Sequence, residues 1–234
     1  MKEEILQTAL KQFLKYGIRK MSVRKLVDPL GISTKTFYKY FKNKEELLEA
    51  VLTLHYTQQY QLLENHSEDQ NVVPLIFDIW HAAIEGEYSV NNKFFHDLHY
   101  YYPELEKKTE AAVGHKFWKK IEQIIQKGIK GGLFREDILP EVAMEGIAVL
   151  YGSVARTREF KKFRVSTHEI FLNTIVLCIR GLCTRKGIRQ LDKHISFIFT
   201  LKRMVVPLNL TKKDDKNITG NIMGMFDIEG SRPN

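Results

Sequence analysis

The side chains between residues 33 and 44 are of the kinds that bind the sugar–phosphate backbone and the base edges of DNA. Hydroxyl groups, lysines and tyrosines dominate this stretch, and they can donate hydrogen bonds to phosphate oxygens or read bases in the major groove. With one arginine from the preceding segment, the candidates are Arg24, Ser33, Thr34, Lys35, Thr36, Tyr38, Lys39, Tyr40 and Lys44. The sequence therefore predicts a surface for double-stranded DNA.

The elements that must position these side chains are two short helices joined by a tight turn over residues 22–41. Gly31 can adopt the left-handed conformation that ends the first helix, and Ser33 can cap the second. Phe37 and Phe41 are spaced to face inward together. The hydroxyls, lysines and tyrosines are then left on the outer side, which is the arrangement that a recognition helix requires.

The flanking segments predict two more helices. Apolar residues recur with helical spacing over 3–16, and Gly17 ends that helix. Asn43 is a suitable N-cap for a further helix, with Glu46 at the capping-box position. Pro29 lies in the last turn of the helix before Gly31, where it removes a backbone donor and predicts that this helix ends early or bends.

The order and spacing of these elements resemble the DNA-binding domain of the TetR family of bacterial transcriptional regulators over residues 3–50. The resemblance is carried by Phe13-Leu14-Lys15-Tyr16-Gly17-Ile18, Leu30-Gly31-Ile32-Ser33 and Thr36-Phe37-Tyr38-Lys39-Tyr40-Phe41-Lys42-Asn43-Lys44-Glu45-Glu46-Leu47. It implies phosphate contacts for Tyr38 and Lys44. The side chains that it directs toward the major groove or its walls are Thr34, Lys35, Thr36, Lys39 and Tyr40.

The charge of the chain is concentrated in the same region. The 234 residues have a formal net charge of +8. Residues 1–50 contain 11 Lys and Arg against 6 Asp and Glu, whereas residues 51–200 contain 19 against 18. A local positive excess favours phosphate binding, although basic surfaces also occur for solubility alone.

The rest of the chain predicts an all-α fold. Helical patterns cover about 43–64, 73–88, 104–130, 141–160, 166–185 and 188–200. We expect a three-helix DNA-binding domain over 1–50, a helical-bundle domain for ligand binding and dimerisation over 51–200, and a flexible tail over 201–234.

Two of these helices have the composition of a subunit interface. Residues 141–158 are rich in small side chains, and residues 170–183 are apolar around most of the helix, so both must be buried. They either cross the core of their own domain or pair with a second copy, and the resemblance implies a dimer built from a four-helix bundle. The candidate contacts are Gly146, Leu150, Gly152, Phe171, Ile175 and Cys178.

Aromatic and histidine residues gather between 77 and 118, where the resemblance implies an effector pocket. Aromatic residues at helical spacing also form ordinary cores, so both interpretations stand. The candidates for contact with a small apolar or aromatic effector are Trp80, Phe95, His99, Tyr100 and Trp118.

The sequence predicts neither metal nor cofactor binding. His96 and His99 could approach each other on a helix, but no third ligand is grouped with them. Cys178 and Cys183 point in different directions on a helix, which fits a reducing compartment. No signal-peptide core or bilayer-length apolar run is present, so we expect a cytoplasmic protein without membrane contact.

The sequence thus predicts a homodimeric regulator, a repressor that binds a nearly palindromic operator and is released by a small-molecule effector. A DNA-binding regulator or adaptor without an effector is the alternative. An enzyme is the remaining class, and no nucleophile elbow, dinucleotide fingerprint, zinc spacing or paired-carboxylate motif supports it.

Overall fold

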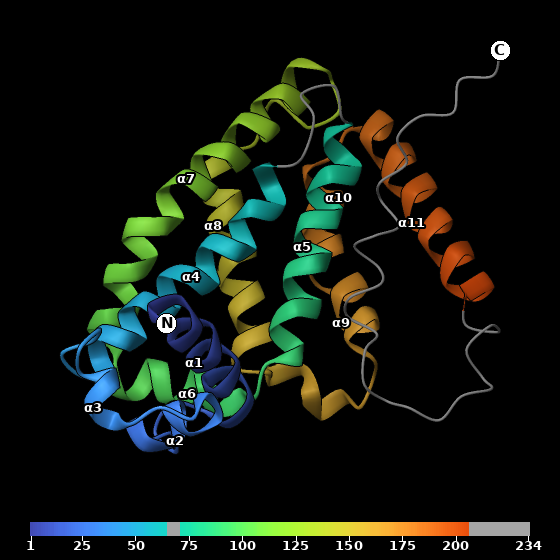
Figure 1. Ribbon diagram of the computed structural model, residues 1–234. Helices are drawn as coiled ribbons and strands as arrows, with labels where there is room; N and C mark the ends of the chain where they lie inside the picture. The colour runs from blue at the N-terminus through green and yellow to red at the C-terminus, as the bar shows by residue number, and fades with distance from the viewer. Residues whose placement is uncertain (65–70, 206–234) are drawn as a thin grey trace, which may run out of the picture. The chain divides into compact units, whose positions relative to one another are not determined.

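The computed structural model describes residues 1–64 and 71–205, and over these ranges the chain forms helices without any β-strand (Figure 1). The predicted all-α fold is confirmed. The elements are α1 (Lys2–Tyr16), α2 (Val23–Val27), the 3-10 turn η1 (Asp28–Leu30), α3 (Thr34–Phe37), α4 (Lys44–Glu64), α5 (Val72–Ser89), α6 (Asn92–Tyr101), α7 (Pro103–Lys130), α8 (Pro140–Tyr151), the π turn η2 (Gly152–Arg156), the 3-10 turn η3 (Glu159–Phe163), α9 (Thr167–Asn173), α10 (Ile175–Leu182) and α11 (Arg185–Val205).

Met1–Asp192 form one compact unit, and the described residues from Lys193 onward belong to a second. The predicted tail begins at residue 201, inside α11, and from residue 206 onward it lies outside the described residues. The predicted boundary at residue 50 falls within α4, a continuous helix, and the division into domains stays a prediction.

The turn of the helix-turn-helix forms for the local reasons that the sequence indicates. Gly31 has a φ of 63°, and its amide donates to the Asp28 carbonyl. The Ser33 side chain accepts a hydrogen bond from the Thr36 amide at 3.1 Å and so caps α3. Pro29 does end the preceding helix early, because α2 stops at Val27 and continues only as η1.

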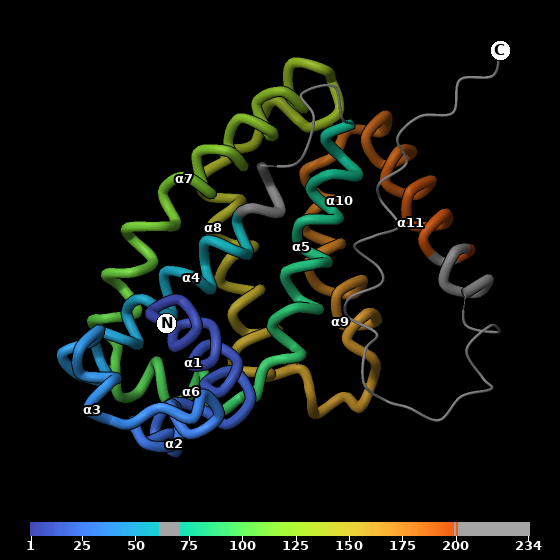
Figure 2. Tube along the Cα trace, in the orientation of Figure 1, coloured from blue at the N-terminus to red at the C-terminus, as the bar shows by residue number. Residues whose placement is uncertain are grey.

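The N-terminal helices share one hydrophobic core with α4 and α6. Phe13, Phe37 and Phe94 are completely buried in it, and α4 runs from the N-terminal helices along α7 (Figure 2). Asn91, the residue before α6, holds that helix against α1: its amide donates to the Leu14 carbonyl at 2.8 Å, and its side chain donates to the Lys15 carbonyl at 3.0 Å.

Helix α6 was not among the predicted helices. It is short, and its buried Phe94, Phe95 and Leu98 extend over little more than one turn, too few for a clear periodic pattern. The signal that could have found it is the Asn91 cap before the apolar residues, since its side chain accepts from the Lys93 amide at 3.0 Å.

Two long helices predicted in the C-terminal half are interrupted. The helix expected over 141–160 ends as an α-helix at Tyr151 and continues as η2 and η3. The helix expected over 166–185 is broken at Thr174, whose hydroxyl donates to the Ile170 carbonyl at 2.6 Å. A threonine that bonds back to the preceding turn bends helices, which accounts for the division into α9 and α10.

The close contact between α7 and a buried aromatic ring gives a test of the fold. A Cβ added at Gly128 in α7 would lie 2.1 Å from Cδ2 of the buried Phe134 ring. We expect Gly128→Ala to lower the free energy of unfolding by about 1–3 kcal/mol, as overpacking does. Urea denaturation measures this change.

The matched control is Gly86→Ala, on the exposed side of α5, where an added Cβ meets nothing within 4 Å. This change should leave stability unaltered or raise it by up to about 1 kcal/mol, because alanine favours a helix. Equal midpoints for the two variants would contradict the packing described here.

Candidate functional site

The predicted DNA-contacting residues lie on the outer side of the helix-turn-helix. Helix α3 is only four residues long, Thr34–Phe37, and turns follow it to Tyr40. The structure leaves three candidates, Thr36, Tyr40 and Lys44, half-buried. The exposed ones are Arg24, Ser33, Thr34, Lys35, Tyr38 and Lys39. Their role in DNA binding stays a prediction.

The inner side of the same segment anchors it. The rings of Phe37 and Phe41 are buried and stack with their centroids 5.7 Å apart. The Tyr38 ring meets Phe37 edge-on at 5.2 Å, while the Tyr38 side chain remains 57% exposed. Tyr38 is therefore oriented by the core and open to solvent at once, as a phosphate-contacting residue must be.

Lys44 differs from the other candidates because it also supports the motif. It is half-buried, and its Nζ donates to the Ile18 carbonyl in the α1–α2 turn at 2.6 Å. Burial lowers the pKa of this ammonium group, and the charge of Asp97 partly opposes that effect. Lys44 thus ties the start of α4 to the α1–α2 turn.

Asp97 in α6 fastens the same turn, and sequence reasoning did not single it out. Its side chain is buried and accepts a hydrogen bond from the Arg19 amide at 2.8 Å. Gly17 has a φ of 84°, and a Cβ there would lie only 3.0 Å from Oδ2 of Asp97. Helix α6 therefore holds the end of α1 by close packing as well as by hydrogen bonds.

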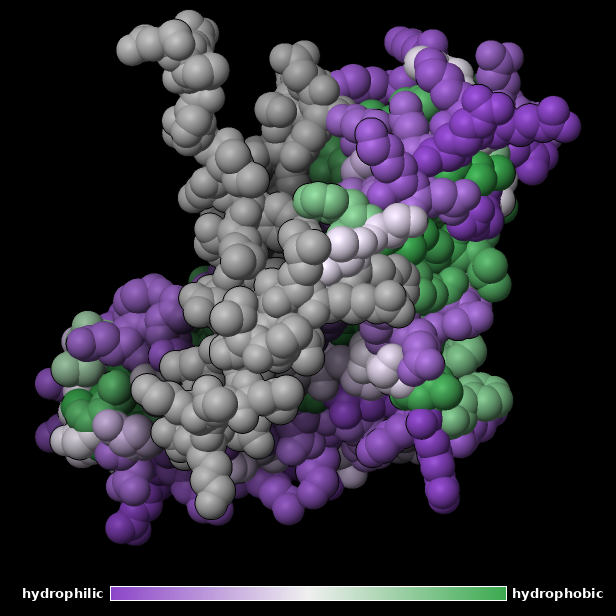
Figure 3. Space-filling model, turned by 90° about the vertical axis from the view of Figure 1, so that its right-hand side faces the viewer, coloured by the Kyte–Doolittle hydropathy of each residue, from purple (hydrophilic) through white to green (hydrophobic). Residues whose placement is uncertain are grey.

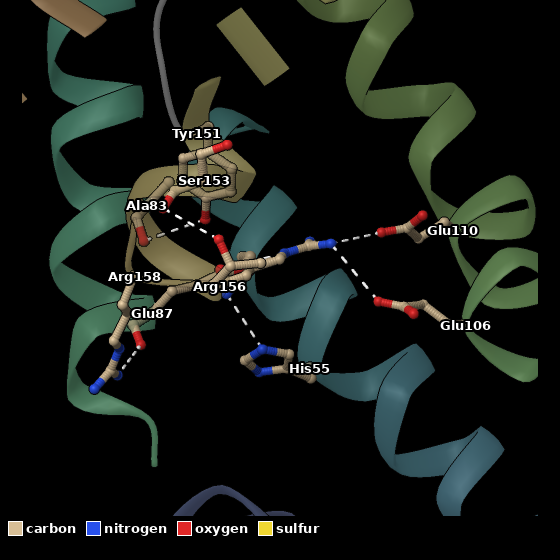
Figure 4. Close-up of polar contacts among 11 residues, drawn as sticks. His55, Ala83, Glu87, Glu106, Glu110, Tyr151, Ser153, Arg156 and Arg158 are labelled. Carbon is tan, nitrogen blue, oxygen red and sulfur yellow. Dashed lines mark hydrogen bonds and ion pairs between the residues drawn. The ribbon is translucent and has the colours of Figure 1, made fainter. Parts of the chain in front are cut away.

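A second group of polar residues lies partly buried among α4, α5, α7 and η2 (Figure 4). Arg156 is its centre: Nε donates to Oε2 of Glu87 at 3.3 Å, and Nη1 donates to Oε1 of Glu110 at 2.8 Å. The same nitrogen lies 3.9 Å from Oε1 of Glu106. Glu87 has no exposed surface, and Arg156 is 26% exposed. We call Glu87, Glu106, Glu110 and Arg156 the Arg156 cluster.

Burial controls the protonation of this cluster and its neighbours. It raises the pKa of Glu87 and of Glu106, and the Arg156 guanidinium opposes both increases. It also raises the pKa of the Tyr60 hydroxyl to about 12. His55 is affected in the opposite sense, because burial first and Arg156 second lower its pKa to about 4. His55 is therefore neutral near pH 7.

The five residues predicted to contact an effector are not brought together. Trp80 and Phe95 are buried, 3% and 5% exposed; the Trp80 ring packs against Tyr151 with centroids 5.4 Å apart, and the Phe95 centroid lies 5.9 Å from Cζ of Arg156. His99, Tyr100 and Trp118 are exposed instead, and His99 faces Glu106 with 3.5 Å between Nδ1 and Oε2. None of the five lines either of two open surface hollows, of about 490 and 600 Å³, that flank α4. Effector contact by these residues stays a prediction.

The residues predicted for a dimer interface also differ in exposure. Phe171 and Ile175 are fully buried in this chain, and the Phe171 ring packs against Phe77 at 5.0 Å. Gly146 is exposed, while Leu150, Gly152 and Cys178 are half-buried. The large apolar side chains exposed on α8 and α10 are Val142, Val149 and Leu177, at 65%, 63% and 57%.

A buried aromatic anchor, a glycine turn and an outward row of basic and hydroxyl side chains define a helix-turn-helix DNA-binding protein. Comparison with known proteins agrees: residues 5–51 match the family described as bacterial regulatory proteins, tetR family. This match assigns residues 5–51 to the DNA-binding domain of that family. No helix in the described part of the chain is long and apolar enough to cross a membrane.

The chain also resembles individual members of known function or structure. It is 27% identical over 148 residues to the HTH-type transcriptional repressor KstR2 of Mycolicibacterium smegmatis, covering 58% of this chain and 69% of that protein. The crystal structure of FadR from Bacillus subtilis in complex with stearoyl-CoA is 18% identical, with a TM-score of 0.61, covering 80% of this chain and 99% of that one. The reduced form of NemR from E. coli is 16% identical, with a TM-score of 0.64, covering 78% and 96%. These two structures have the same fold as this chain.

The exposed lysines of the motif give a test that needs no knowledge of the operator. We expect Lys35→Gln and Lys39→Gln each to weaken binding to a duplex of arbitrary sequence and to reduce the salt-dependence slope by about one unit, because each removes one positive charge from the side predicted to face DNA. Fluorescence anisotropy across a salt series measures both effects. Lys107→Gln, an exposed position in α7, is the control and should change neither.

Lys44→Ala should behave differently from these variants. It should weaken DNA binding and also lower the free energy of unfolding by about 1 kcal/mol or more, because the Ile18 carbonyl loses a charged donor. Unchanged thermal stability in Lys44→Ala would contradict its supporting role.

Proposed function

We propose that this protein is a homodimeric repressor that places two recognition helices in successive major grooves of a nearly palindromic operator and is released by a small-molecule effector. The observation that carries this proposal is the exposed row of lysine, hydroxyl and tyrosine side chains on a segment anchored by Phe37 and Phe41. The similarity to a transcriptional repressor favours repression as the sign of regulation.

Dimerisation is supported by the exposed apolar surface of α8 and α10. Val142 and Val149 are two turns apart in α8 with the exposed Gly146 between them, so the three share one face. Leu177 adds an exposed apolar side chain from α10. Apolar surface is visible as green patches in Figure 3, on the side that faces the reader. We therefore transfer the proposed contacts from Phe171 and Ile175 to these exposed residues.

Effector release needs a physical connection between the C-terminal helices and the DNA-binding helices. Arg158, two residues after Arg156, donates to the carbonyl oxygens at the end of α5, including those of Tyr88 at 3.0 Å and Val90. The next residue, Asn91, bonds to the end of α1. A shift of η2 can therefore reach α1 through a short series of hydrogen bonds.

The FadR structure, which holds stearoyl-CoA, supports the capacity of this fold for a ligand. A hundredfold loss of operator affinity requires a coupling free energy of about 2.7 kcal/mol, which is ordinary for such couplings. The effector must bind the DNA-incompetent state more tightly to have this effect. A DNA-binding regulator without an effector remains the second candidate, favoured by the burial of Trp80 and Phe95 in a packed core.

Selection of bound duplexes from a random pool tests the DNA part of the proposal. We expect enrichment of a nearly palindromic sequence with half-site centres about 10–10.5 bp apart, or a multiple of that. A thermal-shift screen, followed by operator binding with each hit, tests the effector part. Selected sequences without two related half-sites would contradict dimeric binding, and hits that never change operator affinity would favour the effector-free regulator.

The proposed interface predicts the behaviour of charged variants. Val149→Glu and Leu177→Glu should each convert the dimer to a monomer, because the two-fold axis of a dimer brings two like charges into one apolar interface. Sedimentation velocity at micromolar concentration measures the change, and operator affinity should fall with it.

Val165→Glu is the control, at a position that is 47% exposed but lies outside α8 and α10. It should sediment as the parent does. A parent protein that is monomeric and still binds its operator fully would disprove the dimer.

A further inference from the structure

We propose that the Arg156 cluster is a binding site for a small organic cation with an aromatic body, and that the Arg156 guanidinium occupies the position of that cation in the ligand-free protein. This proposal deepens the effector part of the proposed function and rests on it for the link to DNA. The binding itself can be tested without DNA.

The first argument is the balance of charge. Glu87, Glu106 and Glu110 all lie within 3.9 Å of one guanidinium, and Glu106 also lies 3.5 Å from the exposed His99, so three carboxylates surround one permanent positive charge. Two of the three carboxylates are largely buried, with Glu87 and Glu106 0% and 14% exposed. An anionic ligand would increase the electrostatic repulsion among these carboxylates, whereas a cationic ligand would decrease it. The site therefore selects positive charge.

The second argument is the aromatic surround. The Arg156 Cζ atom lies 5.9 Å from the centroids of both the Tyr56 and the Phe95 rings, which are buried. Tyr60 stacks on Phe117 with their centroids 4.6 Å apart, and the charge of Arg156 lowers the Tyr60 pKa against the effect of burial. Aromatic faces attract organic cations as they attract a guanidinium.

The third argument is independent of charge. The Tyr56 hydroxyl and Nε1 of Trp80 are buried without a hydrogen-bond partner, and both side chains are at most 3% exposed. Buried polar atoms normally have partners. An acceptor atom on a ligand would give either of these donors a partner.

A route for exchange exists at the α7 side. The Glu110 side chain is 43% exposed, so the cluster reaches solvent there. Arg156 ends the π turn η2, which the Thr157 amide closes by donating to the Gly152 carbonyl at 3.0 Å. Single π turns are rare in proteins, and those that occur frequently lie at functional sites. A movement of this turn can carry the guanidinium out as a ligand enters.

The competing interpretation is a purely structural ion-pair network that joins α5, α7 and η2. The two interpretations differ in a measurable way. A structural network predicts that loss of Arg156 only destabilises the protein. A cation site predicts that loss of Arg156 also vacates a position that a soluble cation then fills.

Isothermal titration calorimetry of the full chain distinguishes the structural network from the cation site, with three probes of similar size and different charge. The probes are 1-naphthylmethylammonium, 1-naphthylmethanol and 1-naphthoate. We expect the ammonium compound to bind about tenfold more tightly than the other two, and Glu87→Gln to reduce its affinity about tenfold, as loss of one charged hydrogen bond does. Arg156→Met, which keeps an apolar stem, should raise that affinity at least tenfold.

Glu104→Gln is the matched control, since Glu104 is 88% exposed in the same helix as Glu106 and Glu110. It should bind all probes as the parent does. If Arg156→Met fails to fold, the charge preference of the parent and its loss in Glu87→Gln decide the question. Tighter binding of naphthoate, dependent on Arg156, would overturn the cation site, and so would the absence of ammonium binding at millimolar concentration in both the parent and a folded Arg156→Met.

Measurements of operator binding then separate the proposed cation site from the proposed release of the operator by an effector. If the ammonium probe binds but leaves operator affinity unchanged, the cation site stands and its role in effector release fails. If another compound releases the operator while no naphthyl cation binds, effector release stands and the cation site fails.

Discussion

A helix of four residues has no stability of its own, so the position of α3 depends on the burial of Phe37 and Phe41. These two rings connect the DNA-facing side chains to a core that continues without interruption into α4 and α6. Any movement of α6 therefore acts on the recognition segment through packed side chains. Two hydrogen bonds also fix the orientation of the turn between α1 and α2. Asp97 of α6 accepts from the Arg19 amide, and Lys44 of α4 donates to the Ile18 carbonyl.

The two arginines that follow α8 connect this core to the other helices. Arg156 points into the carboxylate cluster, and Arg158 points to the end of α5, which leads directly to the start of α6 (Figure 4). Arg158 has a φ of 58°, a conformation that costs a non-glycine residue about 1 kcal/mol or more. Its hydrogen bonds to three carbonyl groups offset that cost, so the conformation of this turn and the anchoring of α6 depend on each other.

The sequence predicted the features that local interactions decide. Ser33 and Gly31 act within a few residues of themselves, and the spacing of Phe37 and Phe41 fixes which side of the segment is buried. The Arg156 cluster could not be predicted in this way, because Arg156 is 46 residues from Glu110 and 69 from Glu87. The dimer contacts stay a prediction for a related reason: a helix that is apolar over most of its circumference does not show which side faces its own domain, and in α10 it is Ile175 that is buried and Leu177 that is 57% exposed.

A buried ionic cluster suits a switch better than a buried apolar contact would. Replacing a buried ion pair by apolar residues is often neutral for stability, yet removing one partner alone costs about 3–5 kcal/mol. A ligand cation that replaces the Arg156 guanidinium leaves the carboxylates paired. The loss of the guanidinium and the binding of the ligand are each large in free energy, but they oppose each other, so the net change is small. The guanidinium then enters water, and the η2 turn moves with it. Such a near-balance between two arrangements is the condition under which a differential affinity of about 2.7 kcal/mol suffices for a hundredfold response.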